Sequence, residues 1–184
     1  MPRYIAFLRG INLGKRRPKM DELRAIFEKM KFGRVATFIA SGNVIFESSS
    51  RDAALLGKTI ERGLHVALGY EVDTFVRTRE EIAAVAAFRP FSETDMEAPE
   101  STVYCSFLRE PLGAAQARGL LACRTETDEF CVEGREFYWL CRIKSNESKV
   151  WASLPVRALK LPSSTMRNLT TIRKLAAQYP ATAS

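Results

Sequence analysis

Cationic side chains interspersed with glycine and amide residues form the first group that could do chemistry. Residues 9–19, RGINLGKRRPK, hold five Lys or Arg side chains within eleven positions, between an apolar run and a helical pattern. Loops that lead from a strand into a helix often bind phosphate, because free backbone N–H groups point at the ligand. The segment is not a Walker A loop, since only three residues separate its glycines and Arg16 stands where that motif has Ser or Thr. The predicted ligand-binding residues here are Arg9, Gly10, Asn12, Gly14, Lys15, Arg16 and Lys19.

The alternative for this loop is purely structural. Two glycines also suit a strand-to-helix turn that needs positive φ. That interpretation does not account for the density of cations, so both interpretations stay open.

A second group, TMRNLT, lies where the last helix is expected to begin. The unbonded N–H groups and the dipole of a helix start favour an anion, and Arg167 adds a planar donor fork that matches phosphate or carboxylate. The predicted ligand-binding residues are Thr165, Arg167, Asn168 and Thr170. The alternative is that Thr165 or Asn168 caps the helix while Arg167 pairs with an acid.

A third group, Ser41-Gly42-Asn43, separates two predicted strands. As a tight hairpin turn it needs no function. A Ser and an Asn at the end of a sheet could also orient a ligand, so Ser41 and Asn43 join the candidate binding residues. Ser41 has no base nearby in the sequence, which argues against a nucleophile.

Metal and triad chemistry is poorly supported. The cysteines Cys105, Cys123, Cys131 and Cys141 form no C-x-x-C pair, and His65 is the single histidine. A zinc site of the usual kind needs several Cys or His ligands at close spacing. Ser-His-Asp or Cys-His catalysis needs a histidine beside the nucleophile, and only His65 is available. We therefore predict no metal, no cofactor and reduced, structural thiols, with catalytic residues unknown.

Charge is distributed unevenly along the chain. The net charge of +7 divides into +5 for residues 1–24, −5 for residues 25–141 and +7 for residues 142–184. If the two basic ends converge in space, they favour an anionic partner, either a phosphate-bearing small molecule or nucleic acid. The alternative is a basic surface that only aids solubility.

The remaining pattern predicts an α+β protein made of two ferredoxin-like (split βαβ) halves in tandem, plus a C-terminal helix. Residues 1–88 are predicted to form a βαββαβ half with a following helix, in which residues 78–81 form a capping box. Residues 89–100 are predicted to be a linker, and residues 101–184 a βαββα half that ends in the terminal helix at 169–179. We expect no fourth strand in that second half and find no convincing residue-by-residue identity between the halves.

Together the segments LRGINLG, IASGNVIF and TMRNLTTIRKL resemble a family of bacterial proteins known as domain of unknown function 1697. The resemblance implies a small α+β protein of two related halves, and no established activity, substrate or cofactor. Leu169 departs from the family pattern, which usually has Trp there. The positions that match are Arg9, Gly10, Asn12, Gly14, Ser41, Gly42, Asn43, Thr165, Arg167, Asn168 and Thr170.

The leading hypothesis is a cytoplasmic protein that binds a phosphate-bearing ligand or nucleic acid at a basic site shared by the two chain ends. No apolar stretch is long enough for a membrane span or a signal peptide. The alternatives are an enzyme acting on a small anionic metabolite, with an enclosed pocket, and a protein-interaction scaffold, with a large exposed apolar patch.

Overall fold

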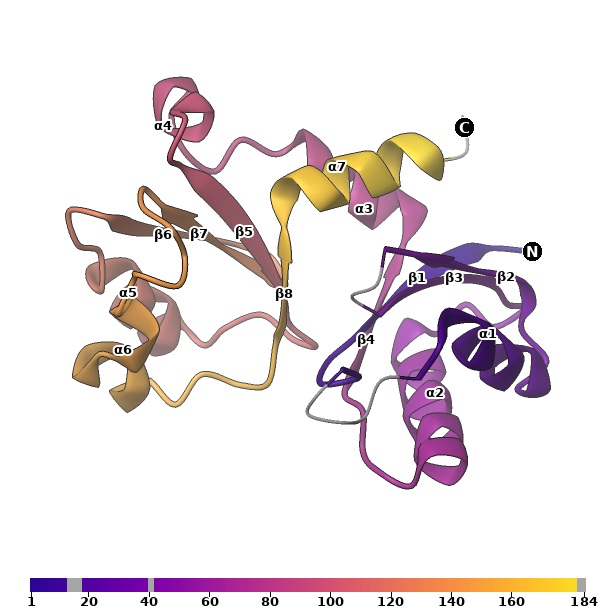
Figure 1. Ribbon diagram of the computed structural model, residues 1–184. Coiled ribbons are helices and arrows are strands. Elements are labelled where there is room, and N and C mark those ends of the chain that lie inside the picture. Colours follow the sequence, from indigo (N-terminus) through magenta and orange to yellow (C-terminus); the bar gives the residue numbers. More distant parts are fainter. Residues whose placement is uncertain (13–17, 40–41, 182–184) are drawn as a thin grey trace. The chain divides into compact units, whose positions relative to one another are not determined.

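The computed structural model describes residues 1–12, 18–39 and 42–181 (Figure 1). The chain divides into two compact units, which we describe separately: Met1–Ala84 with Leu175–Ser184, and Val85–Lys174. Each unit contains one four-stranded sheet in which all neighbouring strands are antiparallel.

The first unit has the order βαββαβ. Its elements are β1 Arg3–Leu8, α1 Met20–Lys29, β2 Gly33–Phe38, β3 Asn43–Glu47, α2 Ala53–Leu68 and β4 Thr74–Thr78, followed by α3 Arg79–Ala87. The strand order β2-β3-β1-β4 is that of a ferredoxin-like unit, as predicted. Alternation places one set of β1 side chains, including Tyr4 and Leu8, in a core with Phe27 of α1 and Ile60 of α2.

The second unit repeats this topology. Its elements are α4 Glu93–Glu97, β5 Thr102–Phe107, α5 Ala114–Ala122, β6 Asp128–Glu133, β7 Glu136–Cys141, the 3₁₀ helix η1 Val150–Ala152, α6 Leu154–Ala158 and β8 Thr165–Asn168, followed by α7 Leu169–Gln178. The strand order is β6-β7-β5-β8. The core on the helical face joins Trp139 and Phe137 of β7 to Leu120 of α5 and Val156 of α6.

Strand β8 corrects one prediction from the sequence, that the second half has no fourth strand. Residues 165–168 pair with β5 from Tyr104↔Asn168 to Phe107↔Thr165, so Thr165 and Arg167 belong to a strand. Helix α7 begins at Leu169, as predicted. The second half is therefore also βαββαβ. Residues 89–100, predicted as a linker, contain the short helix α4.

The helix caps and turns predicted from short sequence motifs are present in the first unit. The predicted capping box is present, because Thr78 N donates to Glu81 Oε2 at 2.8 Å and Glu81 N donates to Thr78 Oγ1 at 3.1 Å. Gly69 ends α2 with a φ of 78°, as expected of a left-handed cap. Gly42, with a φ of 77°, ends the β2–β3 connection, and a Cβ there would lie 2.8 Å from Ile11 Cγ2.

Candidate functional site

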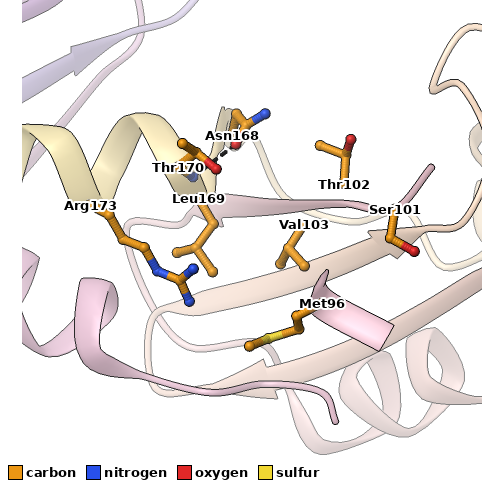
Figure 2. A pocket seen from close by; sticks show the side chains of 8 residues that line it. All are labelled: Met96, Ser101, Thr102, Val103, Asn168, Leu169, Thr170 and Arg173. Carbon is orange, nitrogen blue, oxygen red and sulfur yellow. Dashed lines mark hydrogen bonds between the residues drawn. The ribbon is translucent and has the colours of Figure 1, made fainter. Parts of the chain in front are cut away.

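A pocket in the second unit brings together polar and apolar side chains from α4, β5, the end of β8 and the start of α7 (Figure 2). Its volume is about 90 Å³. The residues that line it are Met96, Ser101, Thr102, Val103, Asn168, Leu169, Thr170 and Arg173. Two of these, Asn168 and Thr170, are among the residues predicted from the sequence.

The start of α7 forms the polar side of the pocket. Strand β8 ends at Asn168, and its side chain caps the helix, because Thr170 N donates to Asn168 Oδ1 at 2.8 Å. This is one of the two caps that the sequence allowed. The first turn of α7, Leu169-Thr170-Thr171, carries no acidic side chain. The positive end of the helix dipole therefore has no carboxylate of its own helix beside it.

Arg173 lies one turn further along α7, and Figure 2 shows its side chain beside that of Leu169. Its Nε donates to the carbonyl oxygen of Ala86 at 3.3 Å. Its Nη2 is buried and has no hydrogen-bond partner among the residues that the structure describes. Burial and, to a lesser degree, the neighbouring Arg89 guanidinium lower the pKa of Arg173 below its ordinary value. Arg173 thus lines the pocket and has a buried cationic nitrogen with unused donor capacity.

Arg89 brings a second positive charge close to Arg173. Its Nη1 donates to three carbonyl oxygens at the end of α3, those of Ala86 at 3.5 Å, Ala87 at 3.2 Å and Phe88 at 3.4 Å. The negative end of the α3 dipole therefore compensates Arg89. Arg173 shares only the Ala86 oxygen.

The opposite wall of the pocket includes Met96 of α4, a helix of five residues. Arg142 fixes this helix from the β7 side, since its Nε donates to Asp95 Oδ1 at 3.1 Å and its Nη2 to Glu129 Oε2 at 2.7 Å. Hydrogen bonds from Ser92 and Arg142 hold the pKa of Asp95 below its usual value. The position of Met96 therefore depends on a small ion-pair network.

The remaining predicted residues of the second unit lie in β8. Arg167 is only 8% exposed, and its Nη1 donates to Thr165 Oγ1 and to the carbonyl oxygen of Met166, both at 2.8 Å. Burial lowers the pKa of Arg167 to about 10. Neither Thr165 nor Arg167 lies at the helix start, where the sequence pattern predicted them; only Asn168 and Thr170 do.

The predicted residues of the first unit occupy several different environments. Arg9, half-exposed, pairs with Asp73 at 3.2 Å, Gly10 takes the positive φ of 73° that a structural turn requires, and Asn12 is exposed in the turn that follows. Lys19 is exposed and directly precedes α1. Asn43 is buried in β3, where its Nδ2 donates to the carbonyl oxygen of Phe38 at 2.9 Å.

Four of the predicted residues lie outside the described part of the chain: Gly14, Lys15, Arg16 and Ser41. Arg9 belongs to the first unit and Arg167 to the second. A site shared by the two chain ends therefore stays a prediction.

The strand registers correct a second expectation from the sequence, that the two halves share no convincing residue-by-residue identity. Tyr4↔Thr78 and Tyr104↔Asn168 are equivalent pairs, and from them the segments YIAFLR and YCSFLR align, with Tyr, Phe, Leu and Arg in common. The same alignment matches Arg77 with Arg167. Arg77 is 1% exposed, and its Nη1 donates to the carbonyl oxygen of Val76 at 3.0 Å, just as Arg167 donates to Met166. A buried arginine at this position is therefore a feature of both halves.

Arg173 is the functional candidate that sequence reasoning missed. A cationic side chain in an amphipathic helix normally extends into solvent, and Lys174 beside it does so, so nothing in the local pattern marks Arg173. The available signal was its spacing of three from Thr170, which places both side chains on one face of α7.

Other site chemistries find no support in the described parts of the chain. No group of three His, Cys, Asp or Glu side chains there could hold a metal ion. The four cysteines are free thiols, and Cys105 is buried as expected. Among the helices of these residues, none has the length and apolar character needed to cross a membrane.

Comparison with known proteins bears on family and fold. A family model described as protein of unknown function (DUF1697) matches residues 1–138. No curated protein matches the chain. Among solved structures, the chain is similar to the conserved bacterial protein SP0830 from Streptococcus pneumoniae, with a TM-score of 0.71 and 21% identity over 97% of this chain and 98% of that one. At this identity the likeness concerns the fold alone.

Proposed function

The chain belongs to the DUF1697 family of proteins of unknown function, and we propose that its second half binds a small anionic molecule in the pocket at the start of α7. Arg173 is the principal contact in this proposal. Asn168 and Thr170 position the helix start, and the hydroxyl-bearing Ser101 and Thr102 add further polar atoms to the lining.

The single observation that carries the proposal is the buried, unpartnered Nη2 of Arg173. A buried donor without an acceptor costs about 1–3 kcal/mol, and more when it is charged. An anion seated against Arg173 would remove that cost and meet the positive end of α7 at the same time. Arg173, which lines the pocket, therefore provides both the charge and the unused donor that an anion requires.

The size of the pocket limits the ligand. Pockets that enclose whole drug-sized ligands have volumes of roughly 300–1,000 Å³. The pocket here has about 90 Å³, which suits one charged group with a short attached chain. A small molecule is favoured over the backbone of a nucleic acid, which would need a longer basic track.

The test replaces Arg173 while leaving the helix intact. We expect Arg173→Gln to weaken binding of inorganic phosphate or a simple carboxylate at least tenfold, because a hydrogen bond to a charged group contributes about 1.5–3 kcal/mol. Binding is measured from the rise in thermal stability with anion concentration at constant ionic strength. The matched control is Lys174→Gln, which removes one exposed positive charge from the same helix.

Two outcomes would contradict the proposal. One is an equal loss of anion affinity in Arg173→Gln and Lys174→Gln, which would indicate general attraction by positive charge rather than a specific binding site at Arg173. The other is saturable binding of a short DNA duplex that Arg173→Gln leaves unchanged and that Arg9→Ala and Lys19→Ala weaken. That result would favour residues 9–19 as the binding site and nucleic acid as the ligand.

A further inference from the structure

The two halves of the chain provide an internal comparison for the pocket. Because Thr78 and Asn168 are equivalent in the strand registers, the helices α3 and α7 that follow them can be compared position by position. Arg79 corresponds to Leu169, Glu80 to Thr170, Glu81 to Thr171 and Ala83 to Arg173.

The helix starts differ in charge at these positions. Helix α3 carries two acids in its first turn, Glu80 and Glu81, and Glu81 accepts a hydrogen bond from Thr78 N at 2.8 Å. Helix α7 has Thr170 and Thr171 instead, and it adds Arg173 where α3 has Ala83. The first half thus supplies its own carboxylates at this place, whereas the second half lacks them and gains a cation.

From this comparison we infer that the pocket takes a carboxylate, the group that Glu80 provides at the position equivalent to Thr170. The inference rests on the proposed function and specifies its ligand class. Thr170 and Arg173 are three residues apart and therefore neighbours on the helix surface. Both residues line the pocket, so a carboxylate held in it would lie between the helix start and the Arg173 side chain.

The charges available in the pocket agree with a singly charged ligand. Arg173 contributes one positive charge, and a helix start contributes the equivalent of roughly half a charge. A carboxylate is neutralised in full by this total, whereas a phosphate monoester that carries the full charge of about −2 exceeds it.

The apolar part of the lining indicates what the carboxylate is attached to. Met96, Val103 and Leu169 line the same pocket. They provide a surface for a short hydrocarbon chain, whose burial is favourable at about 0.8 kcal/mol per CH₂ group. A short aliphatic acid combines the two features.

The experiment compares sodium butyrate, sodium acetate and inorganic phosphate on the full chain at pH 7 and constant ionic strength. We expect butyrate to bind at least threefold more tightly than acetate and at least tenfold more tightly than phosphate. We also expect Thr170→Glu to weaken butyrate binding at least tenfold more than Thr170→Gln does. The glutamate would occupy the site with a tethered carboxylate, and the glutamine of equal size separates charge from bulk.

Thr170→Glu should fold normally, because an acid at a helix start is favourable and Glu80 occupies the equivalent place in α3. An unchanged or raised melting temperature checks this. Equal effects of the Glu and Gln variants would overturn the inference. Phosphate binding that is tighter than butyrate binding and lost in Arg173→Gln would overturn the carboxylate assignment and leave the proposed function standing. Absence of binding by all three anions would overturn both.

Discussion

Two charged side chains of the second half, Asp128 and Arg173, differ in how completely the chain satisfies their hydrogen bonds. Asp128 is 2% exposed, and its carboxylate accepts hydrogen bonds from Thr125, Thr127, Trp139 and Ser148 at 2.7–3.0 Å. Arg173 keeps a buried nitrogen without a partner among the described residues. A charge whose hydrogen bonds are complete within the chain serves the fold, whereas an incomplete one needs an explanation, which for Arg173 is the proposed ligand.

Asp128 gives a prediction on acid stability. Burial raises its pKa, but the four hydrogen bonds outweigh burial and hold the pKa below its ordinary value. The carboxylate therefore stabilises the fold above the unfolded pKa of about 3.9, and this contribution is lost as pH falls through the lower folded pKa. We expect Asp128→Asn to lower the free energy of unfolding by about 1–3 kcal/mol at pH 7.

The measurement is urea denaturation at pH 7 and at steps from pH 5 to pH 2. The wild-type protein should lose stability more steeply with acid than the Asn variant, so that the two curves converge at low pH. A constant difference between the curves across this range would show that the charge of Asp128 does not provide the stabilisation.

At the residue scale, the sequence predicted side chains with local signatures and missed those defined by tertiary contacts. Asn168 was predicted as a possible helix cap because only a few residue types, Asn among them, commonly cap helices. The structure confirms that it caps α7. The unpartnered nitrogen of Arg173 depends on the end of α3, more than eighty positions away in the chain. No pattern of neighbouring residues carries that information.

At the scale of elements, α4 is the part of the pocket most weakly attached to its unit. All of its side chains are at least partly exposed, and Arg142 connects it to Glu129 of β6 through Asp95. Met96 lies on this helix. The wall that would contact the hydrocarbon part of a ligand therefore depends on partly exposed ion pairs, which salt weakens.

We expect Arg142→Gln to loosen α4 without unfolding the second unit. Amide hydrogen exchange across residues 92–97 should accelerate, while exchange in β5 and β7 stays as in the wild type. The comparison variant is Arg118→Gln, which removes an exposed arginine from α5. Unchanged exchange across residues 92–97 would show that the ion pairs do not hold this helix.

Strand β8 shows why elements can escape prediction from the sequence. Its four residues, TMRN, are too few for a recognisable alternation, and a helix begins at the next residue. Pairing with β5 makes it a strand, and this contact is non-local. By contrast, the capping box of α3 and the left-handed end of α2 were predictable, since both depend on residues within one helical turn.

At the scale of the whole molecule, the tandem ferredoxin-like architecture follows from the periodicity of the sequence, and the duplication extends to individual residues. Arg77 and Arg167 take equivalent places and make equivalent bonds. The helices that follow differ in charge, because the first turn of α3 carries two acids, whereas that of α7 carries none and Arg173 follows one turn later. We therefore attribute the residues that both halves share to the fold, and the residues that differ between the halves to function.

The most direct test of an anion site in the second half is an NMR titration of ¹⁵N-labelled protein with sodium butyrate and, separately, sodium phosphate. Backbone signals of Thr102, Leu169 and Thr170 should move and saturate with at least one of the two anions, and Arg173→Gln should abolish the saturation. If these signals stay fixed at high concentrations of both anions while those of Arg9 and Asn12 move, the pocket at the start of α7 is not the binding site.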